Sequence, residues 1–389
     1  MSAGIHAPVI GSTMDTQQAA PVVDFNLHGI LGIRLVNPSA RDVAAVRKQV
    51  GPVGQAFDGE PDITIEFVER LPLASTVHSL GLNEAGFTDD AFLVLRGKHK
   101  SRVRVQIPFD EIGGRIRITC ESGLSAVPLL IPIINLTALA RGVLPLHASA
   151  FIYEGVGVLA TGWSKGGKTE CLLAFASRGA TYVGDEWVYL KPDGTIAGIP
   201  EPIRLWDWHL EQLPQYGGQI ALGDRLRLRA IQLAEATDRR TPAGLKRRFF
   251  LSKGINRLMP LLHGQLHVDV APEKLFGAGR IVSNAPLDTV LFVGSHESPA
   301  ITVNPVDPAE VARRMVFSLE YERLPFMAYY LTYRFAFPER RNALIEEAEA
   351  TQRRLLEDRL RGKHALQVMH PYPFSLQALF DAVSPRIRP

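Results

Sequence analysis

The sequence contains only two cysteines in 389 residues, Cys120 and Cys171, so a framework of several disulfides is excluded. Charge of one sign is not in excess, because 43 Lys and Arg stand against 40 Asp and Glu and the formal net charge is +3. Such a chain is not expected to bind nucleic acid through its overall charge. The first twenty residues contain no Lys or Arg, so the basic region of a secretory signal peptide is lacking.

Long apolar runs are also scarce. The longest, 124–140, is at the short limit for a bilayer span, and Pro128, Pro132 and Asn135 interrupt it. We therefore expect a buried helix near 124–141 and no membrane partner. The small number of cysteines agrees with a reducing compartment, and we expect the protein to be cytoplasmic.

The composition is that of an ordinary globular protein, with 46% hydrophobic and 21% charged residues. A length of 389 residues predicts two or three domains. Residues 1–21 are rich in small and polar side chains and predict a flexible N-terminus. Alternating segments at 63–68, 102–107 and 115–119, separated by turns, predict a small β-rich, mostly antiparallel N-terminal domain over 22–122.

From residue 123 onward, strands alternate with helices, which predicts an α/β domain with a mixed sheet over 123–335. Residues 336–389 are expected to form a helical C-terminal extension, because 340–361 is a polar stretch with alternating charge. The elements expected within the α/β domain are strands at 144–153 and 155–161, a glycine-rich loop at 162–169, a helix at 169–178 and one apolar strand at 180–190.

The segment Gly162-Trp163-Ser164-Lys165-Gly166-Gly167-Lys168-Thr169 matches the pattern G-x-x-x-x-G-K-[ST] at every fixed position. Glycines there let backbone N–H groups approach a polyphosphate, and the N-terminus of the following helix adds partial positive charge. Lys168 is expected to reach the β- and γ-phosphates, and the Thr169 hydroxyl to ligate Mg²⁺. We therefore expect ATP and Mg²⁺ as cofactors, the alternative being a glycine-rich turn that happens to carry Lys-Thr. The residues expected to bind the nucleotide are Gly162, Ser164, Lys165, Gly166, Gly167, Lys168, Thr169 and Glu170.

Two carboxylates, Asp185 and Glu186, follow an apolar strand shortly after this loop. Carboxylates beside a phosphate site suit either Mg²⁺ binding or proton abstraction from an acceptor hydroxyl. Elsewhere, an Asp-Glu pair at the end of a strand is usually a solvated turn. We favour a functional role because of the neighbouring loop.

The segment 155–159 running into the loop, together with 178–179 and 183–186, resembles the catalytic domain of the HPr kinase/phosphorylase family and its relatives. The segment 146–149, Leu-His-Ala-Ser, is similar to the His-containing segment that precedes the loop in that family. The resemblance covers about 144–206, is looser to about residue 335, and does not include the N-terminal region. It implies a P-loop fold of the phosphoenolpyruvate-carboxykinase-like type. The implied activity is transfer of the γ-phosphoryl group of ATP to a serine-type hydroxyl.

The resemblance also implies individual roles. Asp185 falls at the position of the family's general base, and His147 at the position of a His near the phosphates. His147 can equally be a core-edge residue that bonds a backbone carbonyl. The family's second acidic position is usually Asp and is Glu186 here. Together with Lys168, which neutralises the charge on the transferring group, these residues and Arg204 form the expected catalytic set. The expected metal ligands are Thr169, Asp185, Glu186 and Glu201.

The family's bifunctional members carry the signature Glu-x-Arg-Gly-Leu-Gly-Ile, which phosphorolysis requires. This chain has Pro200-Glu201-Pro202-Ile203-Arg204-Leu205-Trp206 in roughly that place, with other spacing and without the glycines. Glu201 is interpreted as an acid on the metal side and Arg204 as a cation on the phosphate side. We therefore expect a related kinase with an acceptor other than HPr.

Residues 224–257 contain ten Lys and Arg against three Asp and Glu. They indicate either a surface that receives an acidic acceptor (a peptide, a carrier protein or a small molecule) or a solvated helix and loop. Nucleic acid is not expected, because neither interleaved aromatic residues nor a recognised motif accompanies the charge. A homo-oligomer is considered, because family members of the phosphorylase type form hexamers. Two other functions stay open: a nucleotide-binding sensor or scaffold, and an NTPase without a phosphoryl acceptor.

Overall fold

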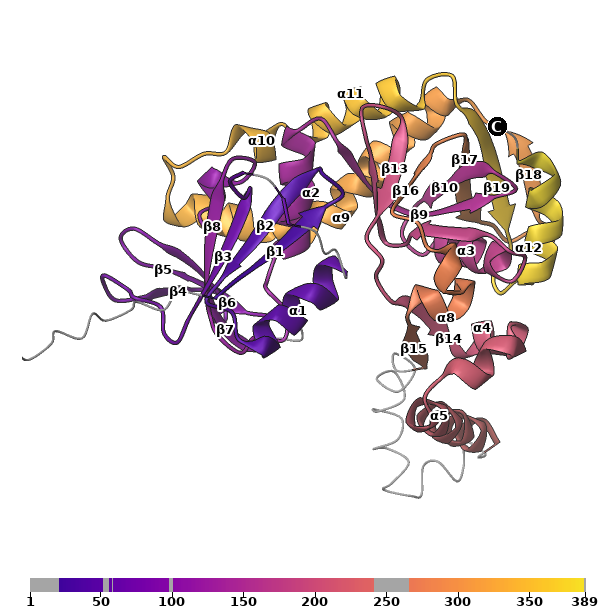
Figure 1. The fold of residues 1–389 in the computed structure, drawn as a ribbon, viewed down its shortest axis with the longest axis horizontal. Helices are drawn as coiled ribbons and strands as arrows, with labels where there is room; N and C mark the ends of the chain where they lie inside the picture. Colours follow the sequence, from indigo (N-terminus) through magenta and orange to yellow (C-terminus); the bar gives the residue numbers. More distant parts are fainter. Residues whose placement is uncertain (1–20, 52–55, 58, 98–100, 241–265, 388–389) are drawn as a thin grey trace, which may run out of the picture.

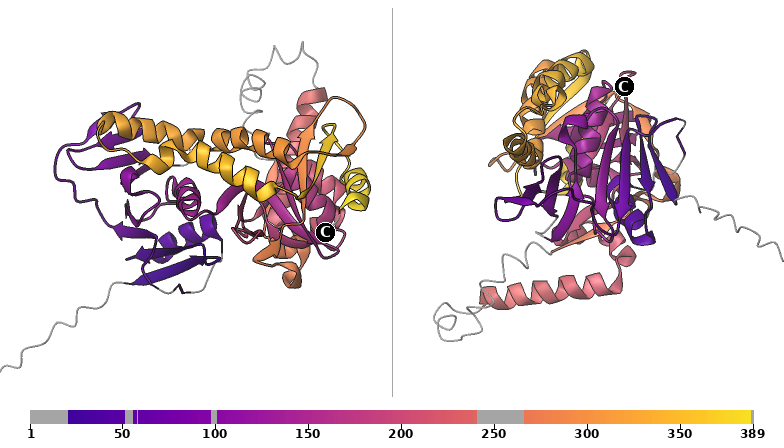
Figure 2. Two further views of the ribbon diagram at one scale, coloured as in Figure 1. Left: turned by 90° about the horizontal axis from the view of Figure 1, so that it is seen from above. Right: turned by 90° about the vertical axis from the view of Figure 1, so that its left-hand side faces the viewer.

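The structure, a computed structural model, describes residues 21–51, 56–57, 59–97, 101–240 and 266–387, with only the backbone of 232–240. Two lobes lie beside each other, and the long helix α9 (Pro308–Ala336) runs along both (Figures 1 and 2). Each lobe is built on a large sheet with helices packed against it. The expected α/β class with a mixed sheet is confirmed.

The N-terminal lobe contains an eight-stranded sheet in the order β1-β2-β3-β8-β7-β6-β5-β4. Most neighbours are antiparallel, but β3 pairs in parallel with both β2 and β8. Helix α1 (Ala40–Val50) was not expected; it begins with a capping box in which Ser39 and Asp42 bond each other's backbone. The strands are β1 (Val22–Leu27), β2 (Leu31–Val36), β3 (Ile63–Val68), β4 (His78–Leu80), β5 (Ala85–Phe87), β6 (Phe92–Arg96), β7 (Arg102–Gln106) and β8 (Ile116–Glu121).

The C-terminal lobe contains a nine-stranded sheet in the order β16-β13-β12-β9-β10-β17-β19-β18, with β11 also paired to β9. Its centre is mixed, because β9 is antiparallel to β10 while β10, β17 and β19 run in parallel. The strands are β9 (Leu144–Tyr153), β10 (Val156–Gly162), β11 (Thr181–Gly184), β12 (Trp187–Leu190), β13 (Thr195–Gly198), β16 (Asn284–Pro286), β17 (Thr289–Ser295), β18 (Thr302–Pro305) and β19 (His364–His370), with β14 (Ile203–Trp206) and β15 (His267–Val270) as a separate pair.

The remaining helices are distributed over both lobes. Helix α3 follows β10 and packs against α12 near the C-terminus, while α9 and α11 lie side by side. Within the described residues, every helix is too short or too polar to cross a bilayer. The bounds are α2 (Leu130–Ala140), α3 (Lys168–Ala176), α4 (Asp207–Gln212), α5 (Leu222–Arg240), α8 (Pro272–Phe276), α10 (Ala343–Glu346), α11 (Ala348–Leu360) and α12 (Leu376–Val383).

Two sequence-based expectations are wrong. The single strand expected at 180–190 is two strands, β11 and β12, because Glu186 adopts a left-handed backbone (φ 64°) and turns the chain between them. Both halves still pair with β9, one after the other. The C-terminal extension is not only helical, since β19 within it lies inside the large sheet between β17 and β18. The division into domains at residues 122 and 335 stays a prediction.

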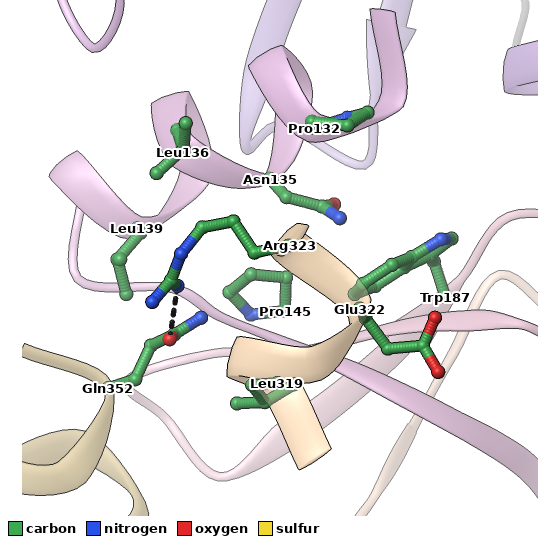
Figure 3. A pocket seen from close by; sticks show the side chains of 10 residues that line it. All are labelled: Pro132, Asn135, Leu136, Leu139, Pro145, Trp187, Leu319, Glu322, Arg323 and Gln352. Atoms are coloured by element: carbon green, nitrogen blue, oxygen red, sulfur yellow. Dashed lines mark hydrogen bonds between the residues drawn. The ribbon is translucent and has the colours of Figure 1, made fainter. Parts of the chain in front are cut away.

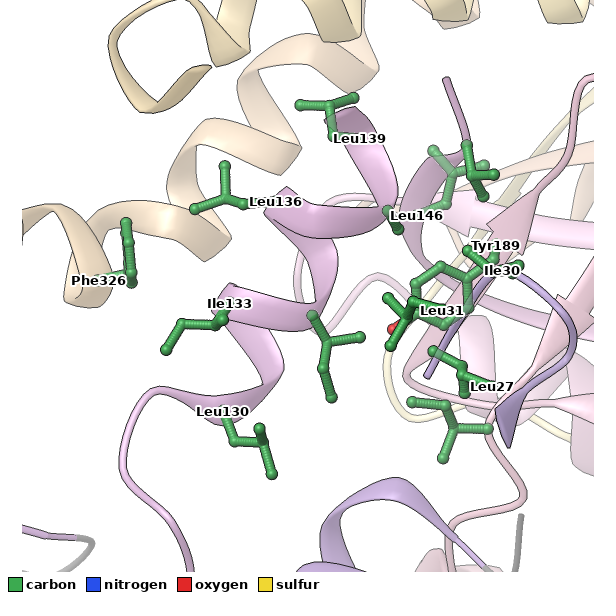
Figure 4. Packing of buried hydrophobic residues seen from close by; sticks show 14 of the residues in the cluster. Leu27, Ile30, Leu31, Leu130, Ile133, Leu136, Leu139, Leu146, Tyr189 and Phe326 are labelled. Atoms are coloured by element: carbon green, nitrogen blue, oxygen red, sulfur yellow. The ribbon is translucent and has the colours of Figure 1, made fainter. Parts of the chain in front are cut away.

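A shared core joins the two lobes. Helix α2, the expected apolar helix, begins at Leu130 rather than near 124, because Leu129 takes a left-handed backbone directly after Pro128. Its side chains contact both lobes, and one buried cluster contains Leu31 from β2, Ile133 from α2 and Leu146 from β9 (Figure 4). Burying each such side chain stabilises the fold by about 1.5–3 kcal/mol. The packing of α2 therefore contributes to holding the lobes together.

Candidate functional site

The glycine-rich loop connects β10 to α3, as expected. Gly162 ends β10 beside Val293 of β17, where a side chain would collide with the Val293 carbonyl. Gly167 has a positive φ of 99°, and a Cβ there would collide with the ring of His370. No side chain caps the N-terminus of α3 at Gly167. Because the first N–H groups of a helix lack intrahelical acceptors, this end of α3 is suited to binding an anion.

Lys168 lies inside the loop rather than extending into solvent. Its Nζ donates a hydrogen bond to the carbonyl of Trp163 at 3.0 Å, and only 6% of the residue is exposed. Burial lowers the pKa of Lys168, although the carboxylates of Glu186, Glu322 and Asp185 act in the opposite direction. A buried cation whose hydrogen bond goes to an uncharged carbonyl is suited to neutralising an incoming phosphate.

Asp185 is the buried carboxylate nearest the start of α3. The Thr169 hydroxyl lies 3.3 Å from its Oδ1 and 3.2 Å from its Oδ2, and the Ser149 hydroxyl donates to Oδ1 at 2.5 Å. Burial, reinforced by the neighbouring charge of Glu186, raises the pKa of Asp185 to about 7. This carboxyl can therefore take up and release a proton near neutral pH.

His147 lies between two carboxylates. Its Nδ1 is 2.7 Å from Glu322 of α9, and its Nε2 is 3.1 Å from Glu186. Burial by itself would lower the pKa of His147, but the hydrogen bonds to Glu186 and Glu322 outweigh it and raise the pKa. The hydrogen bond to His147 in turn lowers the pKa of Glu186. The interpretation of His147 as a core residue bonded to a carbonyl is therefore wrong.

Glu170, the first acid of α3, is also paired. His209 of α4 lies 3.3 Å from Glu170, and both are largely buried. Burial opposes ionisation of Glu170, but the His209 contact outweighs it and lowers the pKa. Glu170 therefore faces α4, and its expected contact with the nucleotide stays a prediction.

Arg204 lies on β14, and Glu201 lies just before that strand. The Arg204 Nε donates to Asp269 of β15 at 3.1 Å, and its charge helps to lower the pKa of Glu186. Arg204 is thus within electrostatic range of the acidic cluster. Glu201 precedes β14, and its backbone N–H donates to the Ile199 carbonyl. The roles expected for these two residues are untested.

A narrow cavity of about 30 Å³ adjoins His147, between α2, α9 and α11 (Figure 3). Trp187, whose ring stacks on His147 with centroids 5.8 Å apart, lines it together with Glu322. Arg323 lies toward Gln352, to which it donates a hydrogen bond at 2.6 Å. A cavity of this volume holds about two water molecules, so it is too small for a phosphoryl acceptor.

Three further residues belong to the site and were not foreseen from the sequence. Ser149 follows His147 by two positions on β9, so strand periodicity places both side chains on one face. That spacing is a signal the sequence does contain. Glu322 and His370 are far away along the chain, where no local pattern marks them.

Part of the basic stretch lies outside the described residues. This applies to residues 241–257 and to the side chains of 232–240. Of the described cations, Arg225 donates to the Ile220 carbonyl, and Arg227 bonds Asp224 and the His267 carbonyl. These two arginines have partners within the chain. Whether the stretch receives an acidic acceptor stays a prediction.

Oxygen donors suited to Mg²⁺ are present, although no protein-only metal site is formed. Among the described residues, no three His, Cys, Asp or Glu side chains converge to hold a metal ion. The Thr169 hydroxyl and the Asp185 carboxylate are adjacent oxygen groups, the donor type that Mg²⁺ prefers. Mg²⁺ in nucleotide sites takes only one or two such ligands and completes its shell with phosphates and water.

Comparison with known proteins adds little to this geometry. No family model matches the sequence, and no curated protein matches it. Among solved structures, the chain is similar to the HPr(Ser) kinase/phosphatase from Coxiella burnetii. The match has 12% sequence identity and a TM-score of 0.24, and it covers 62% of this chain and 94% of that one. A TM-score this low does not establish a common fold, so the function is argued from the site alone.

Proposed function

We propose that this protein is an ATP-dependent kinase that transfers the γ-phosphoryl group to a hydroxyl acceptor. The observation that carries the proposal is the buried Asp185 carboxylate within 3.3 Å of the Thr169 hydroxyl, directly after the glycine-rich loop. A phosphate loop supplies the nucleotide site, and an adjacent carboxyl with a pKa of about 7 supplies a general base. We also propose that the lobe belongs to the P-loop, phosphoenolpyruvate-carboxykinase-like type.

In this proposal, each residue of the site has a separate role in binding the nucleotide or stabilising its charge. Backbone N–H groups at the start of α3 bind the phosphates, and Lys168 neutralises the charge that develops on them. The Thr169 hydroxyl would hold Mg²⁺, which, when bound, offsets the negative charge of the phosphates, and the Asp185 carboxylate is left free to act as the base. The hydrogen bonds to Glu186 and Glu322 raise the pKa of His147 and so favour its cationic form, which suits stabilisation of the transferring phosphoryl group.

In the proposed transfer step, Asp185 is the base that accepts the proton of the acceptor hydroxyl. The acceptor oxygen bonds to the γ-phosphorus, the bond from phosphorus to the ADP oxygen breaks, and the acceptor proton passes to the Asp185 carboxylate. Because the pKa of Asp185 is about 7, the carboxylate is populated at neutral pH and can still accept a proton. We propose a serine-type hydroxyl as the acceptor, on a peptide, a carrier protein or a small molecule.

The test is ³¹P detection of ATP turnover with Mg²⁺, together with direct measurement of ATP binding. The acceptors are free serine, a Ser-containing acidic peptide, and buffer alone. Lys168→Met is expected to lose ATP binding, whereas Asp185→Asn is expected to retain binding and to lose transfer by about 10²–10⁴-fold. Lys274→Met, on the exposed face of α8, is the matched control for loss of a lysine.

The outcomes separate the candidate functions. A phosphorylated acceptor that disappears with Asp185→Asn supports the kinase. Phosphate release in buffer alone, unchanged by any acceptor, indicates an NTPase. Tight ATP binding without turnover under any condition indicates a sensor or scaffold. Transfer by Asp185→Asn at the wild-type rate would show that Asp185 is not the base.

A further inference from the structure

Helix α9 carries a row of apolar side chains that stay largely exposed in the described chain, although Arg353 lies over the Phe317 ring and Trp163 packs against Tyr321. Five of them are large and between 48% and 73% exposed, and the sixth, Ala328, is exposed as well. Elsewhere in the described chain, large exposed apolar residues are spread over several elements, whereas these follow one helix. The six positions, named here the outer row, are Phe317, Tyr321, Leu324, Ala328, Leu331 and Phe335.

The spacing of the outer row is that of a helix–helix seam. Successive members are four, three, four, three and four residues apart, a mean of 3.6 residues, so the row forms one continuous stripe along a straight helix. At 100° per residue the six side chains fall within about 80° of one another. From Phe317 to Phe335 the row extends about 27 Å along the axis.

The outer row is opposite the face by which α9 packs onto its own protein. The buried residues Met315, Phe326 and Tyr333 point about 160–180° away from it. Pro325, the one proline inside the helix, lies beside the row rather than in it. A helix that is apolar on two opposite sides needs a partner on each of them. The protein's own core provides only one.

The row is large enough for a stable pair. Aromatic side chains bury about 150–250 Å² each. Three of the six positions are aromatic and two are leucines, so with roughly half of each large side chain still exposed, pairing would cover at most about 600 Å² per chain, or about 1,200 Å² in total. This value is at the lower end of the standard size for specific protein interfaces, about 1,200–2,000 Å².

We propose that the outer row is the interface through which two copies of this chain associate, with their α9 helices packed antiparallel. The order of the spacings is the same from either end of the row, so in an antiparallel two-fold pair each member lies opposite another member of the partner's row. In this register Phe317 lies opposite Phe335 of the partner, and Leu324 lies opposite Ala328. The small Ala328 near the two-fold axis allows the helices to approach closely. The proposal does not depend on the proposed phosphoryl transfer.

The interface reaches the glycine-rich loop. The ring of Tyr321, in the outer row, packs against Trp163 of the loop with centroids 5.0 Å apart, and Trp163 is itself 51% exposed. The next residue of α9, Glu322, bonds His147. Association of two copies therefore places the partner's helix beside the entrance to the candidate site of each.

The first test measures molecular mass in solution by light scattering and sedimentation on the full chain. Wild type is expected at twice the 42.8 kDa of one chain. Leu324→Glu with Leu331→Glu places charges in the row and is expected to weaken association by roughly 100-fold or more. Leu82→Glu is the matched control, because Leu82 is 87% exposed and lies outside the outer row, in the turn between β4 and β5.

A cross-linking experiment tests the register. Both native cysteines are buried, so an introduced thiol on α9 reacts selectively. Phe317→Cys and Phe335→Cys proteins are expected to cross-link when mixed and not when each is alone. Cross-linking of either protein with itself would indicate a parallel pair and contradict the proposal. A wild-type monomer at 100 µM, or a dimer that persists with both glutamates present, would overturn it.

Discussion

The hydroxyl of Ser149 donates a hydrogen bond to Oδ1 of Asp185 at 2.5 Å, joining a strand that precedes the glycine-rich loop to the carboxylate that follows it. Both residues are buried, and the same carboxylate lies beside Thr169. Burial raises the pKa of Asp185, while this hydrogen bond acts to lower it. The hydrogen bond from Ser149 therefore favours ionisation of Asp185, the proposed base.

Removing this hydroxyl is expected to shift the pH dependence of catalysis. In Ser149→Ala the carboxylate loses a donor, so the pKa of Asp185 should rise further above 7. A hydrogen bond to a charged group contributes about 1.5–3 kcal/mol, which corresponds to roughly one to two pH units. The acid limb of the rate profile for ATP turnover should move upward by that amount. Ser177→Ala, at the exposed end of α3, should leave the limb in place. An unmoved limb in Ser149→Ala would contradict this role.

Asp185 also predicts a pH dependence of stability. Its folded pKa lies above the unfolded value, so the folded state binds the proton more tightly, and this group's contribution to stability falls as pH rises from about 4 to 7. Asp185→Asn removes this titration. Relative to wild type, the free energy of unfolding of the variant should be higher at pH 8 than at pH 5, measured by urea denaturation. Asp89→Asn, on an exposed turn, serves as the control. If the stability of Asp185→Asn relative to wild type were instead higher at pH 5 than at pH 8, the raised pKa assigned to Asp185 would be refuted.

His147 should show its own pH signature. Its folded pKa is raised by Glu186 and Glu322, so its stabilising contribution is complete below about pH 6.5 and is lost as pH rises through the folded pKa. His147→Gln should therefore destabilise the protein more at pH 6 than at pH 9. Guanidinium unfolding at the two pH values measures the difference, with the exposed His78→Gln as a control. Equal losses of unfolding free energy at pH 6 and pH 9 would mean that His147 stays uncharged between Glu186 and Glu322.

Gly167→Ala tests the geometry of the loop. The substitution introduces a Cβ at a positive φ of 99° and against the His370 ring, so the loop must move or the backbone must change. We expect a loss of about 1–3 kcal/mol in the free energy of unfolding together with a loss of ATP binding. Gly217→Ala, where an added Cβ meets nothing within 4 Å, is the matched control. Wild-type affinity for ATP in Gly167→Ala would show that the loop does not bind phosphate.

The local part of the candidate site was predictable because it lies within one short stretch. The pattern over 162–169 predicted the loop between a strand and a helix, and β10 and α3 confirm both elements. Gly179, shortly after the end of α3, has the left-handed backbone that favours glycine, with a φ of 89°. Asp307 is the N-cap of α9, and its side chain accepts a hydrogen bond from the Ala309 N–H. Each of these features depends on backbone preferences that extend over a few residues.

The break between β11 and β12 could not be predicted in the same way. Gly184, Asp185 and Glu186 interrupt the apolar segment 180–190, but this local signal does not by itself require Glu186 to adopt a left-handed backbone. The bend is maintained by two partners: β9 pairs with the strands on both sides, and His147 holds the Glu186 carboxylate. Such contacts join residues far apart in sequence, where periodicity carries no information.

The sequence by itself determined the glycine-rich loop, its flanking strand and helix, and the α/β class, because these follow from local conformational preference and hydrophobic periodicity. Only the tertiary structure decided that Ser149 and Thr169 meet Asp185, that His147 lies between Glu186 and Glu322, and that the outer row of α9 faces outward. The side-chain contacts among them arise when a sheet and a long helix bring together residues between 16 and 175 positions apart in the sequence. Burial and charge pairing at the meeting points then set the pKa values on which the proposed chemistry depends.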